Sequence, residues 1–350
     1  MLAPVTHMLA LTHIRRQRLL PFPGQVMVRL GQSVKPADVI AQVPRPGSHL
    51  IVDVRRMLRL PPSVKMDQVL QVHQGDKVEK DMPLGEYEGM FTRIARAPED
   101  GTVVMIQGGR VVLETAPEIL HVFAEMSGEV TEIIPERGAW VETDGALLQG
   151  VWGNDHTISA LLMTRMSSPD ETLDVNRLDV SMRGGILAVG HCSNADVLRI
   201  ATEIPLRGLI LGSMTADLVP VAEKLTMPIL VLEGFGKIPV NPLAYKILTS
   251  SDQREISLLA HRWTPYAANR PEVVIPLNAA AEYPNDTAQF RPGQMVRVNT
   301  GKNAGRCGKL SQIRPGVRVF PSGLTAQAAD LQMEDGTEIC LPVANLDVLE

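Results

Sequence analysis

Glycine and proline occur throughout this chain and divide it into short segments. The sequence holds 28 glycines and 26 prolines among 350 residues, and because proline ends helices and glycine weakens them, long helices are disfavoured. Between these residues, valine and isoleucine often alternate with polar side chains, which is the period of a half-buried strand. The sequence therefore predicts an α+β protein that is mainly β, with many short strands.

The size and composition indicate a globular protein of several domains. A length of 350 residues corresponds to two or three domains at ~150 residues each. Hydrophobic residues make up 45% of the chain and charged residues 21%, which excludes bulk disorder. No apolar run approaches the ~20 residues that a membrane helix needs, so we expect no membrane insertion. The arginines near the N-terminus follow an apolar stretch, the reverse of a secretory signal, and we expect a cytoplasmic protein.

The cysteines and the charge exclude further classes. The three scattered cysteines include no CxxC pair, which excludes zinc ribbons, iron–sulfur clusters and disulfide scaffolds, so no metal and no cofactor is expected. A net charge of −5 disfavours general coating of nucleic acid but allows local basic patches. The N-terminal segment, residues 1–19, is such a patch, with Arg15, Arg16 and Arg18 and no acidic residue before Asp38. We expect a solvated arm there, or an arm that lies against an acidic partner.

One unit recurs in the first half of the chain: a strand, a glycine turn with a short polar stretch, and another strand. Its copies lie at residues 24–41, 69–85, 97–113 and 127–148, and glycine supplies the positive φ that such turns commonly need. Gln74–Val78 (Gln-Gly-Asp-Lys-Val), together with Ala97-Pro98 and the strand up to Val104, resembles the barrel-sandwich hybrid of biotinyl and lipoyl carrier domains. The resemblance implies a barrel-sandwich hybrid-like β region over residues 20–155.

The same resemblance argues against a carrier function. Carrier domains hold a modified lysine at a hairpin tip, whereas the corresponding residues 86–95 contain no lysine. Other proteins use this lipoyl-like hybrid only as structure, among them membrane-fusion adaptors and parts of large respiratory and transcription complexes. We therefore expect a rigid β scaffold; an inactive relative of the carrier or membrane-fusion proteins is a further reading.

The middle of the chain changes to alternating strands and helices. Apolar runs at residues 184–190, 207–212 and 228–233 are followed by helix-like stretches at 194–204, 216–225 and 242–248. Continuous apolar strands that alternate with helices indicate parallel βαβ units covered on both faces. The sequence thus predicts a small parallel α/β layer over residues 180–265.

The carboxyl ends of these parallel strands would meet at one edge, where open α/β sheets bind ligands. Two of the loops also lead into helix N-termini, which favour anions. The candidate ligand residues at this edge are His191, Ser193, Asn194, Ser213, Thr215 and Glu233. In the alternative interpretation they are helix caps and turn residues, and neither a Walker sequence nor a GxGxxG fingerprint accompanies them.

The last part of the chain, residues 288–350, is a third unit. Residues 290–298 and 301–313 resemble a KOW motif, a strand, glycine-rich loop and strand found in ribosomal proteins and transcription elongation factors. The resemblance implies a C-terminal SH3-like KOW barrel that binds RNA, binds protein or is only structural. Basic residues gather in its first half, and a glycine loop with cations could follow a phosphate backbone. The candidate partner-binding residues are Lys302, Asn303 and Arg306, flanked by Arg297, Lys309 and Arg314.

These features predict a non-enzymatic scaffold or adaptor that presents the KOW-like barrel to a protein or ribonucleoprotein partner, with RNA binding left open. The alternative is a small-ligand binding protein or enzyme that takes an anion or a nucleotide at the edge of the α/β layer. Many short strands also leave edges that need covering, so a homo-oligomer is a further expectation.

Overall fold

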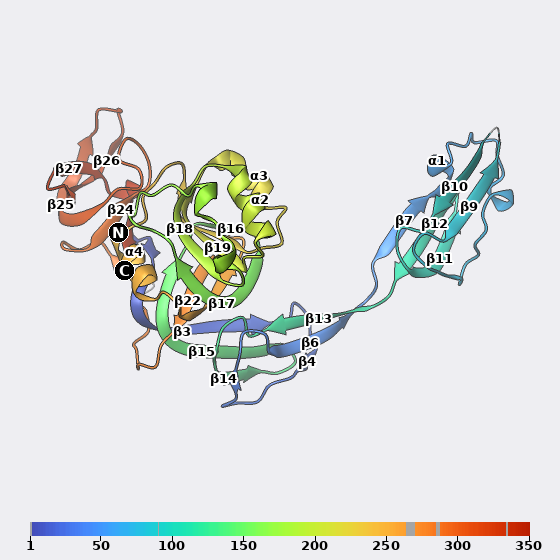
Figure 1. Ribbon diagram of the computed structural model, residues 1–350, viewed down its shortest axis with the longest axis horizontal. Coiled ribbons are helices and arrows are strands. Elements are labelled where there is room, and N and C mark those ends of the chain that lie inside the picture. The colour runs from blue at the N-terminus through green and yellow to red at the C-terminus, as the bar shows by residue number, and fades with distance from the viewer. Residues whose placement is uncertain (1, 90, 264–269, 285–287, 334) are drawn as a thin grey trace.

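The computed structural model describes residues 2–89, 91–263, 270–284, 288–333 and 335–350, so Met90, one of the residues 86–95 that include no lysine, lies outside the described residues. The protein is α+β and mainly β, with several sheets and few helices, as the sequence predicts. Figure 1 shows a body that contains both ends of the chain and a lobe connected to it by a narrow ribbon. The longest described helices have nine residues, and none in the described part is long and apolar enough to cross a membrane.

Parallel strands form the centre of the body and confirm the predicted α/β layer. All seven residues of both β18 and β19 are buried, and β20 is buried along most of its length. Asn194 caps the helix after β18 by accepting a hydrogen bond from Asp196 N. The elements are β18 (Ile186–Cys192), α2 (Ala195–Glu203), β19 (Gly208–Met214), α3 (Val219–Ala222) and β20 (Ile229–Phe235).

The same sheet continues with antiparallel strands, which pack against the parallel strands in one hydrophobic core. The sheet is extended through β17 (His156–Thr164), β21 (Glu255–Ala260), β22 (Glu272–Pro276), β15 (Gly138–Gln149), β14 (Gly128–Ile134) and β5 (Ser33–Val34). One hydrophobic core joins Ile210 and Leu230 of the parallel strands to Leu148, Leu258 and Val273 of the antiparallel ones. Helix α4 (Pro242–Ser250) contributes to this core, and β16 (Trp152–Gly153) pairs with β20 at the edge of the sheet.

The N-terminal segment is a strand of this body, so the expectation of a solvated arm over residues 1–19 is wrong. Strand β3 (Met8–Leu19) is antiparallel to β15 along most of its length. Its Ile14 is fully buried, and Arg18 is 6% exposed. The arginines are accommodated because they meet carboxylates of distant segments: Arg16 pairs with Glu272, and Arg18 pairs with Glu125.

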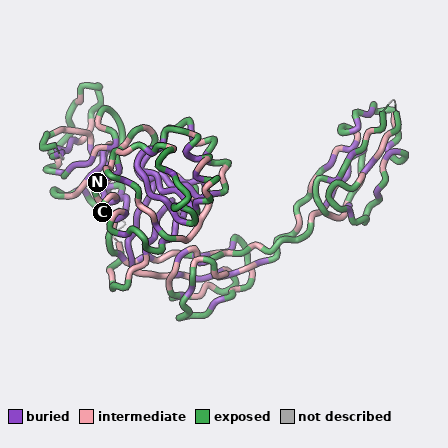
Figure 2. Tube along the Cα trace, in the orientation of Figure 1, coloured by how far each residue is buried: buried purple, intermediate pink, exposed green. Residues whose placement is uncertain are grey.

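The β region expected over residues 20–155 is divided into two parts. Residues 48–115 form a distal lobe, with a hydrophobic core whose residues all lie between Val52 and Leu113. The lobe is attached through an antiparallel stem of two strands, β6 and β13, whose lobe-side end Figures 1 and 2 show as a thin and exposed connection. The stem strands are β6 (Val39–Arg45) and β13 (Glu118–Phe123), and β4 (Gln25–Val26) pairs with β6 on the body side.

Within the distal lobe, the strands follow the glycine-turn pattern. Gly75 has φ +95° in the turn before β8, as the recurring unit predicts. One sheet has the order β7-β12-β11-β8, and β9 and β10 form a hairpin. The elements are β7 (His49–Asp53), α1 (Val54–Met57), β8 (Lys77–Val78), β9 (Pro83–Glu88), β10 (Thr92–Arg96), β11 (Gly101–Gln107) and β12 (Arg110–Thr115).

The end of the chain folds into a C-terminal module, residues 288–350, with its own core around Val296, Leu310 and Leu331. The strand, loop and hairpin order expected for this part is present. The N-terminus completes the sheet, because β2 (Val5–Thr6) lies parallel to β28. The remaining strands are β1 (Leu2–Ala3) with β23 (Ala288–Gln289), and β24 (Met295–Val298), β25 (Cys307–Val319), β26 (Thr325–Met333), β27 (Glu338–Pro342) and β28 (Leu346–Leu349).

Candidate functional site

The loop between β24 and β25, residues 299–306, is held in a defined shape. Thr300 donates hydrogen bonds from its backbone N and its Oγ1 to Asn345 Oδ1, at 2.9 and 2.7 Å. At the other end of the loop, Gly305 has φ +77°, and a Cβ at this position would clash with Ile238 of the body. The loop is therefore anchored at both ends, while Lys302 at its middle is exposed.

Arg297 does not belong to an accessible surface, so the prediction that it flanks a partner-binding site is wrong. The residue is 4% exposed, and its guanidinium lies 2.8 Å from Glu233 and 3.5 Å from Asp347. Burial lowers the pKa of Arg297, but the charge and hydrogen bond of Glu233 outweigh burial and raise it overall. The pair of Arg297 and Glu233 joins two candidate sites that were predicted as separate, the KOW-like loop and the α/β edge.

Two other predicted cations are paired within the module. Arg306 Nη2 lies 2.6 Å from Asp335, and its Nη1 donates to Asn303 Oδ1 at 3.4 Å. Arg314 Nε lies 2.8 Å from Asp330 Oδ2, and its hydrogen bond is the main cause that lowers the pKa of Asp330 to about 2.

The acidic second half of the module therefore neutralises much of the basic first half. Lys302 and Lys309 remain exposed, and no carboxylate of the described residues forms an ion pair with either. The accessible charge is thus smaller than the count of basic residues indicates.

The candidate ligand residues at the α/β edge are occupied by their own chain. His191 Nδ1 lies 2.9 Å from Ser213 Oγ, which donates to Ile238 O at 2.7 Å and accepts from Ile238 N at 3.2 Å. Burial lowers the pKa of His191, so the neutral imidazole is favoured. Glu233 Oε1 accepts two hydrogen bonds from Asn241.

The segment 234–241 consequently lies across the strand ends. Val240 packs so closely that a Cβ at Gly212 would clash with it. Thr215 Oγ1 donates to Cys192 O at 3.3 Å, and Ser193 is exposed beside the helix cap Asn194. These contacts support the capping and turn interpretation of the edge, and they do not support a ligand site there.

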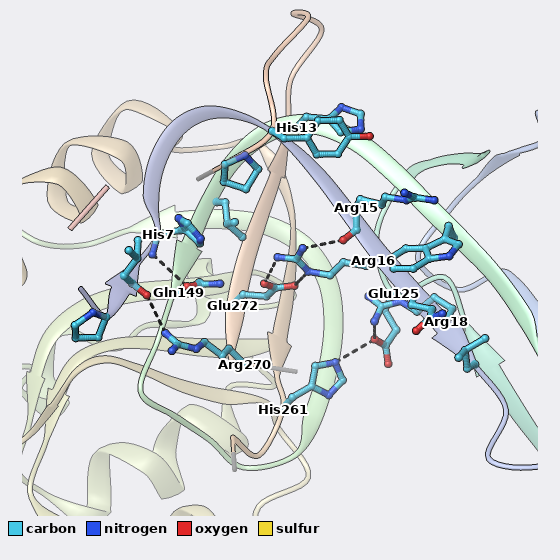
Figure 3. A pocket seen from close by; sticks show the side chains of 18 of the residues that line it. His7, His13, Arg15, Arg16, Arg18, Glu125, Gln149, His261, Arg270 and Glu272 are labelled. Carbon is cyan, nitrogen blue, oxygen red and sulfur yellow. Dashed lines mark hydrogen bonds and ion pairs between the residues drawn. The ribbon is translucent and has the colours of Figure 1, made fainter. Parts of the chain in front are cut away.

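A polar cavity of about 1070 Å³, which was not predicted from the sequence, follows β3. Figure 3 shows its wall, to which β3, β15, β22 and the segments near His261 and Tyr283 contribute. The charged and polar residues that line it include His7, His13, Arg15, Arg16, Gln17, Arg18, Glu125, Gln149, His261, Arg270 and Glu272. The only signal in the sequence is the spacing of Arg16 and Arg18, which places both on one face of a strand.

Two carboxylates of the cavity are each held by cations. Glu272 forms two hydrogen bonds with Arg16, from Nε at 2.7 Å and from Nη2 at 2.6 Å. Glu125 Oε2 lies 3.0 Å from Arg18 Nη1 and 3.1 Å from His261 Nε2. Burial raises the pKa of Glu125, but the hydrogen bond of His261 and the charge of Arg18 outweigh it, so the pKa is lowered.

Two arginines of the cavity have a weaker set of partners. Arg18 donates from Nε to Ala124 O at 2.9 Å, and its buried Nη2 has no hydrogen-bond partner among the described residues. Arg270 donates to Val5 O at 3.3 Å and lies over the ring of Trp263, 5.6 Å from its centroid. The cavity therefore holds positive charge that the described carboxylates do not fully neutralise.

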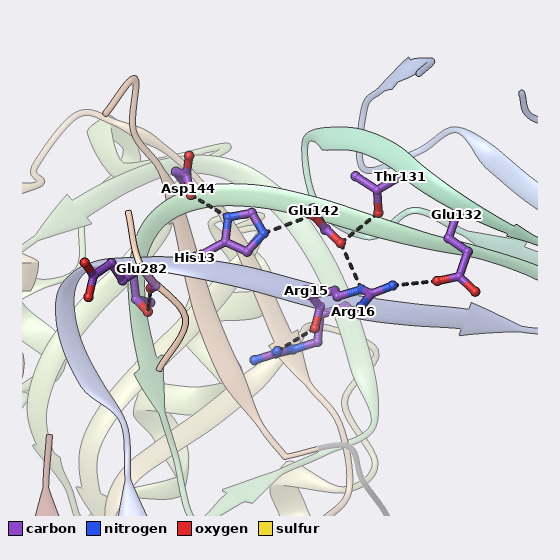
Figure 4. A network of polar contacts seen from close by, with 9 residues as sticks. His13, Arg15, Arg16, Thr131, Glu132, Glu142, Asp144 and Glu282 are labelled. Carbon is purple, nitrogen blue, oxygen red and sulfur yellow. Dashed lines mark hydrogen bonds and ion pairs between the residues drawn. The ribbon is translucent and has the colours of Figure 1, made fainter. Parts of the chain in front are cut away.

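A second polar network, whose His13 and Arg15 also line the cavity, fixes β3 to β15 (Figure 4). His13 lies between Asp144 at 2.7 Å and Glu142 at 3.0 Å. Arg15 pairs with Glu142 and Glu132 at 2.8 and 2.6 Å. The network holds the N-terminal strand in place, and this strand also carries Arg16 and Arg18.

Comparison with known protein families found no match, and comparison with curated proteins found no similar sequence. Among the described residues, no group of three or more His, Cys, Asp or Glu side chains is placed to hold a metal ion.

Proposed function

We propose that this protein is a non-enzymatic scaffold or adaptor that presents its C-terminal module to a protein or ribonucleoprotein partner. The observation that supports this proposal is the anchored loop 299–306, which exposes Lys302 from a fixed frame. A loop that is ordered before binding loses less conformational entropy when a partner docks. Lys302 and Asn303 would contact the partner, with Lys309 and the outer faces of Arg306 and Arg314 around them.

The pairing of cations favours a protein partner over RNA. Binding to a phosphate backbone depends on the number of cations that can replace counterions. Here Arg306 and Arg314 already hold Asp335 and Asp330. A partner with a small acidic surface matches the two exposed lysines better than a long phosphate chain does.

The distal lobe supports an adaptor with a second contact surface. Ile51, Val112 and Met105 are cross-strand neighbours on three adjacent strands of its sheet. Ile51 and Met105 are exposed, and the lobe stands away from the body on the stem. Two separated contact surfaces on one chain are typical of a protein that connects other proteins. The location that we propose for it is the cytoplasm.

A charge-reversal experiment tests the proposal. The full-length protein is purified with a tag from the source cells as wild type, as K302E/K309E, and as the control K224E/K246E. Lys224 and Lys246 are exposed positions of the body, and both double variants change the net charge equally. Co-purifying proteins are quantified by mass spectrometry, with and without ribonuclease treatment.

We expect K302E/K309E to lose a component that the wild type and K224E/K246E both retain, at an unchanged melting temperature. Loss of that component on ribonuclease treatment would identify a ribonucleoprotein, and retention would identify a protein. Identical recovery by all three forms would refute the proposal.

A further inference from the structure

Arg18 is a buried cation with incomplete hydrogen bonding. It is 6% exposed and lines the cavity along β3, and its Nη2 has no hydrogen-bond partner among the described residues. Buried donors in native proteins nearly always have a partner, and a charged donor left without one is especially costly. A bound acceptor in the cavity would remove this cost.

The charges around Arg18 specify what kind of acceptor fits. Both carboxylates of the inner wall are already engaged, Glu272 by two bonds from Arg16 and Glu125 by Arg18 Nη1 and His261. Arg270 adds a further cation, which contacts a backbone oxygen and an aromatic ring. The unmatched charge of the wall is therefore positive, which an anion would balance and a cation would increase.

The backbone beside Arg18 is arranged to hold its guanidinium in one orientation. Glu125 has φ +59°, a left-handed conformation that is unfavourable for a glutamate. Its backbone N donates to Pro36 O at 2.9 Å, and its carboxylate holds Arg18 Nη1. Because Arg18 Nε donates to Ala124 O, two of the three guanidinium nitrogens of Arg18 have partners. Nη2 is the nitrogen that has none among the described residues. Strained backbone of this kind clusters at functional sites.

We propose that the cavity along β3 binds a small molecule with a carboxylate or phosphate group, and that Arg18 and Arg270 hold that group. Guanidinium donors match the oxygen geometry that carboxylates and phosphates share. The cavity, at about 1070 Å³, has the size of small-molecule sites and exceeds what a lone inorganic ion fills. The ligand is therefore an organic anion, and the free ions serve as minimal probes.

Calorimetric titration of the full-length protein tests the site with two probes, inorganic phosphate and succinate, each up to tens of millimolar. Sodium chloride keeps the ionic strength constant, because screening alone changes weak electrostatic signals. The variants are R18K and R270Q, and the control is R29Q, an exposed arginine of the same N-terminal region. We expect saturable binding of at least one probe, with Kd raised about 10-fold in R18K and in R270Q and unchanged in R29Q.

Saturation by phosphate alone would identify a phosphorylated ligand, and saturation by succinate alone would identify a carboxylate. The absence of saturable binding for both probes, or equal Kd in wild type, R18K and R270Q, would overturn the proposal. If R18K does not fold, R270Q decides, because the hydrogen bond of Arg270 is to one backbone oxygen. The site is independent of the adaptor surface, so K302E/K309E should bind the probe as the wild type does.

Discussion

The guanidinium of Arg297 and the carboxylate of Glu233 meet at 2.8 Å in the interior, and both side chains are almost completely buried. Arg297 lies on β24 of the C-terminal module, and Glu233 lies near the end of β20 in the body. Asp347 completes the pair on one side and Asn241 on the other. The module is thus attached to the body through a buried ionic network, in addition to the apolar contact of Gly305 with Ile238.

Replacing Arg297 should destabilise the protein strongly. In R297M the carboxylate of Glu233 stays buried without its cation, and such a loss costs about 3–5 kcal/mol. The free energy of unfolding is measured by urea denaturation, with the exposed Arg291 changed to Met as the control. In E233Q/R297M the buried carboxylate at position 233 is removed as well, so part of the stability should return. Equal stability of R297M and R291M would contradict the buried role of the pair.

The His13 clamp should make stability depend on pH. Burial lowers the pKa of His13, but the hydrogen bonds and charges of Asp144 and Glu142 outweigh burial and raise it above 6.5. A raised pKa in the folded state adds stability that is complete below the unfolded pKa and is lost as pH rises through the folded pKa. The stability difference between wild type and H13Q should therefore be largest below pH 6.5, about 1–2 kcal/mol, and shrink at alkaline pH.

Thermal melts from below pH 6.5 to alkaline pH measure the stability difference between wild type and H13Q. H49Q, at an exposed histidine of the distal lobe, is the matched control and should show no such trend. A stability difference between wild type and H13Q that does not change with pH would show that His13 is not protonated in the folded protein.

The distal lobe should unfold independently of the body. Its buried apolar residues contact one another within residues 52–113, and only the two strands of the stem connect it to the rest. Deleting residues 46–117 and closing the stem with a short glycine turn should remove one calorimetric transition and leave the main transition in place. A lobe of this size has a small core, so its own transition is expected at the lower temperature. A shift of the main transition by many degrees would show energetic coupling between lobe and body.

Cys192 should resist alkylation as long as the protein is folded. Burial raises the pKa of its thiol to about 11, so the reactive thiolate is scarce at pH 8. Cys340 is partly exposed, and it should react with iodoacetamide before Cys192 does. Peptide mapping after timed labelling gives both rates, and urea should abolish the difference. Equal rates in the native protein would contradict the burial of Cys192.

The central strands were predictable because their signal is local. Ile186–Cys192 and Gly208–Met214 are buried throughout, and their apolar runs with helical stretches between them indicate parallel strands. Turns such as the one at Gly75 need a positive φ that glycine supplies, and this also can be read from neighbouring residues.

The cavity was not predictable because its partners are distant in sequence. Arg16 and Glu272 are 256 positions apart, and nothing near either residue indicates the other. Three arginines on one short segment are most often solvated, and the charge pattern of β3 agrees with that interpretation. Only the structure shows that Glu272 and Glu125 lie beside Arg16 and Arg18. In the C-terminal module, the sequence shows that the second half is acidic. Which cation meets which carboxylate, such as Arg314 and Asp330, depends on the register of β25 against β26.

The parallel contact of β2 with β28 also constrains the order of assembly. Val5 aligns with Val348, and the backbone N of Met8 donates to Glu350 O. During synthesis β2 emerges before β28, its neighbour in the sheet, and most of the described elements lie between the two in sequence. The backbone of β2 therefore cannot pair with β28 until the C-terminal module folds. Folding of this module is thus the step that fixes the N-terminal strands in the structure.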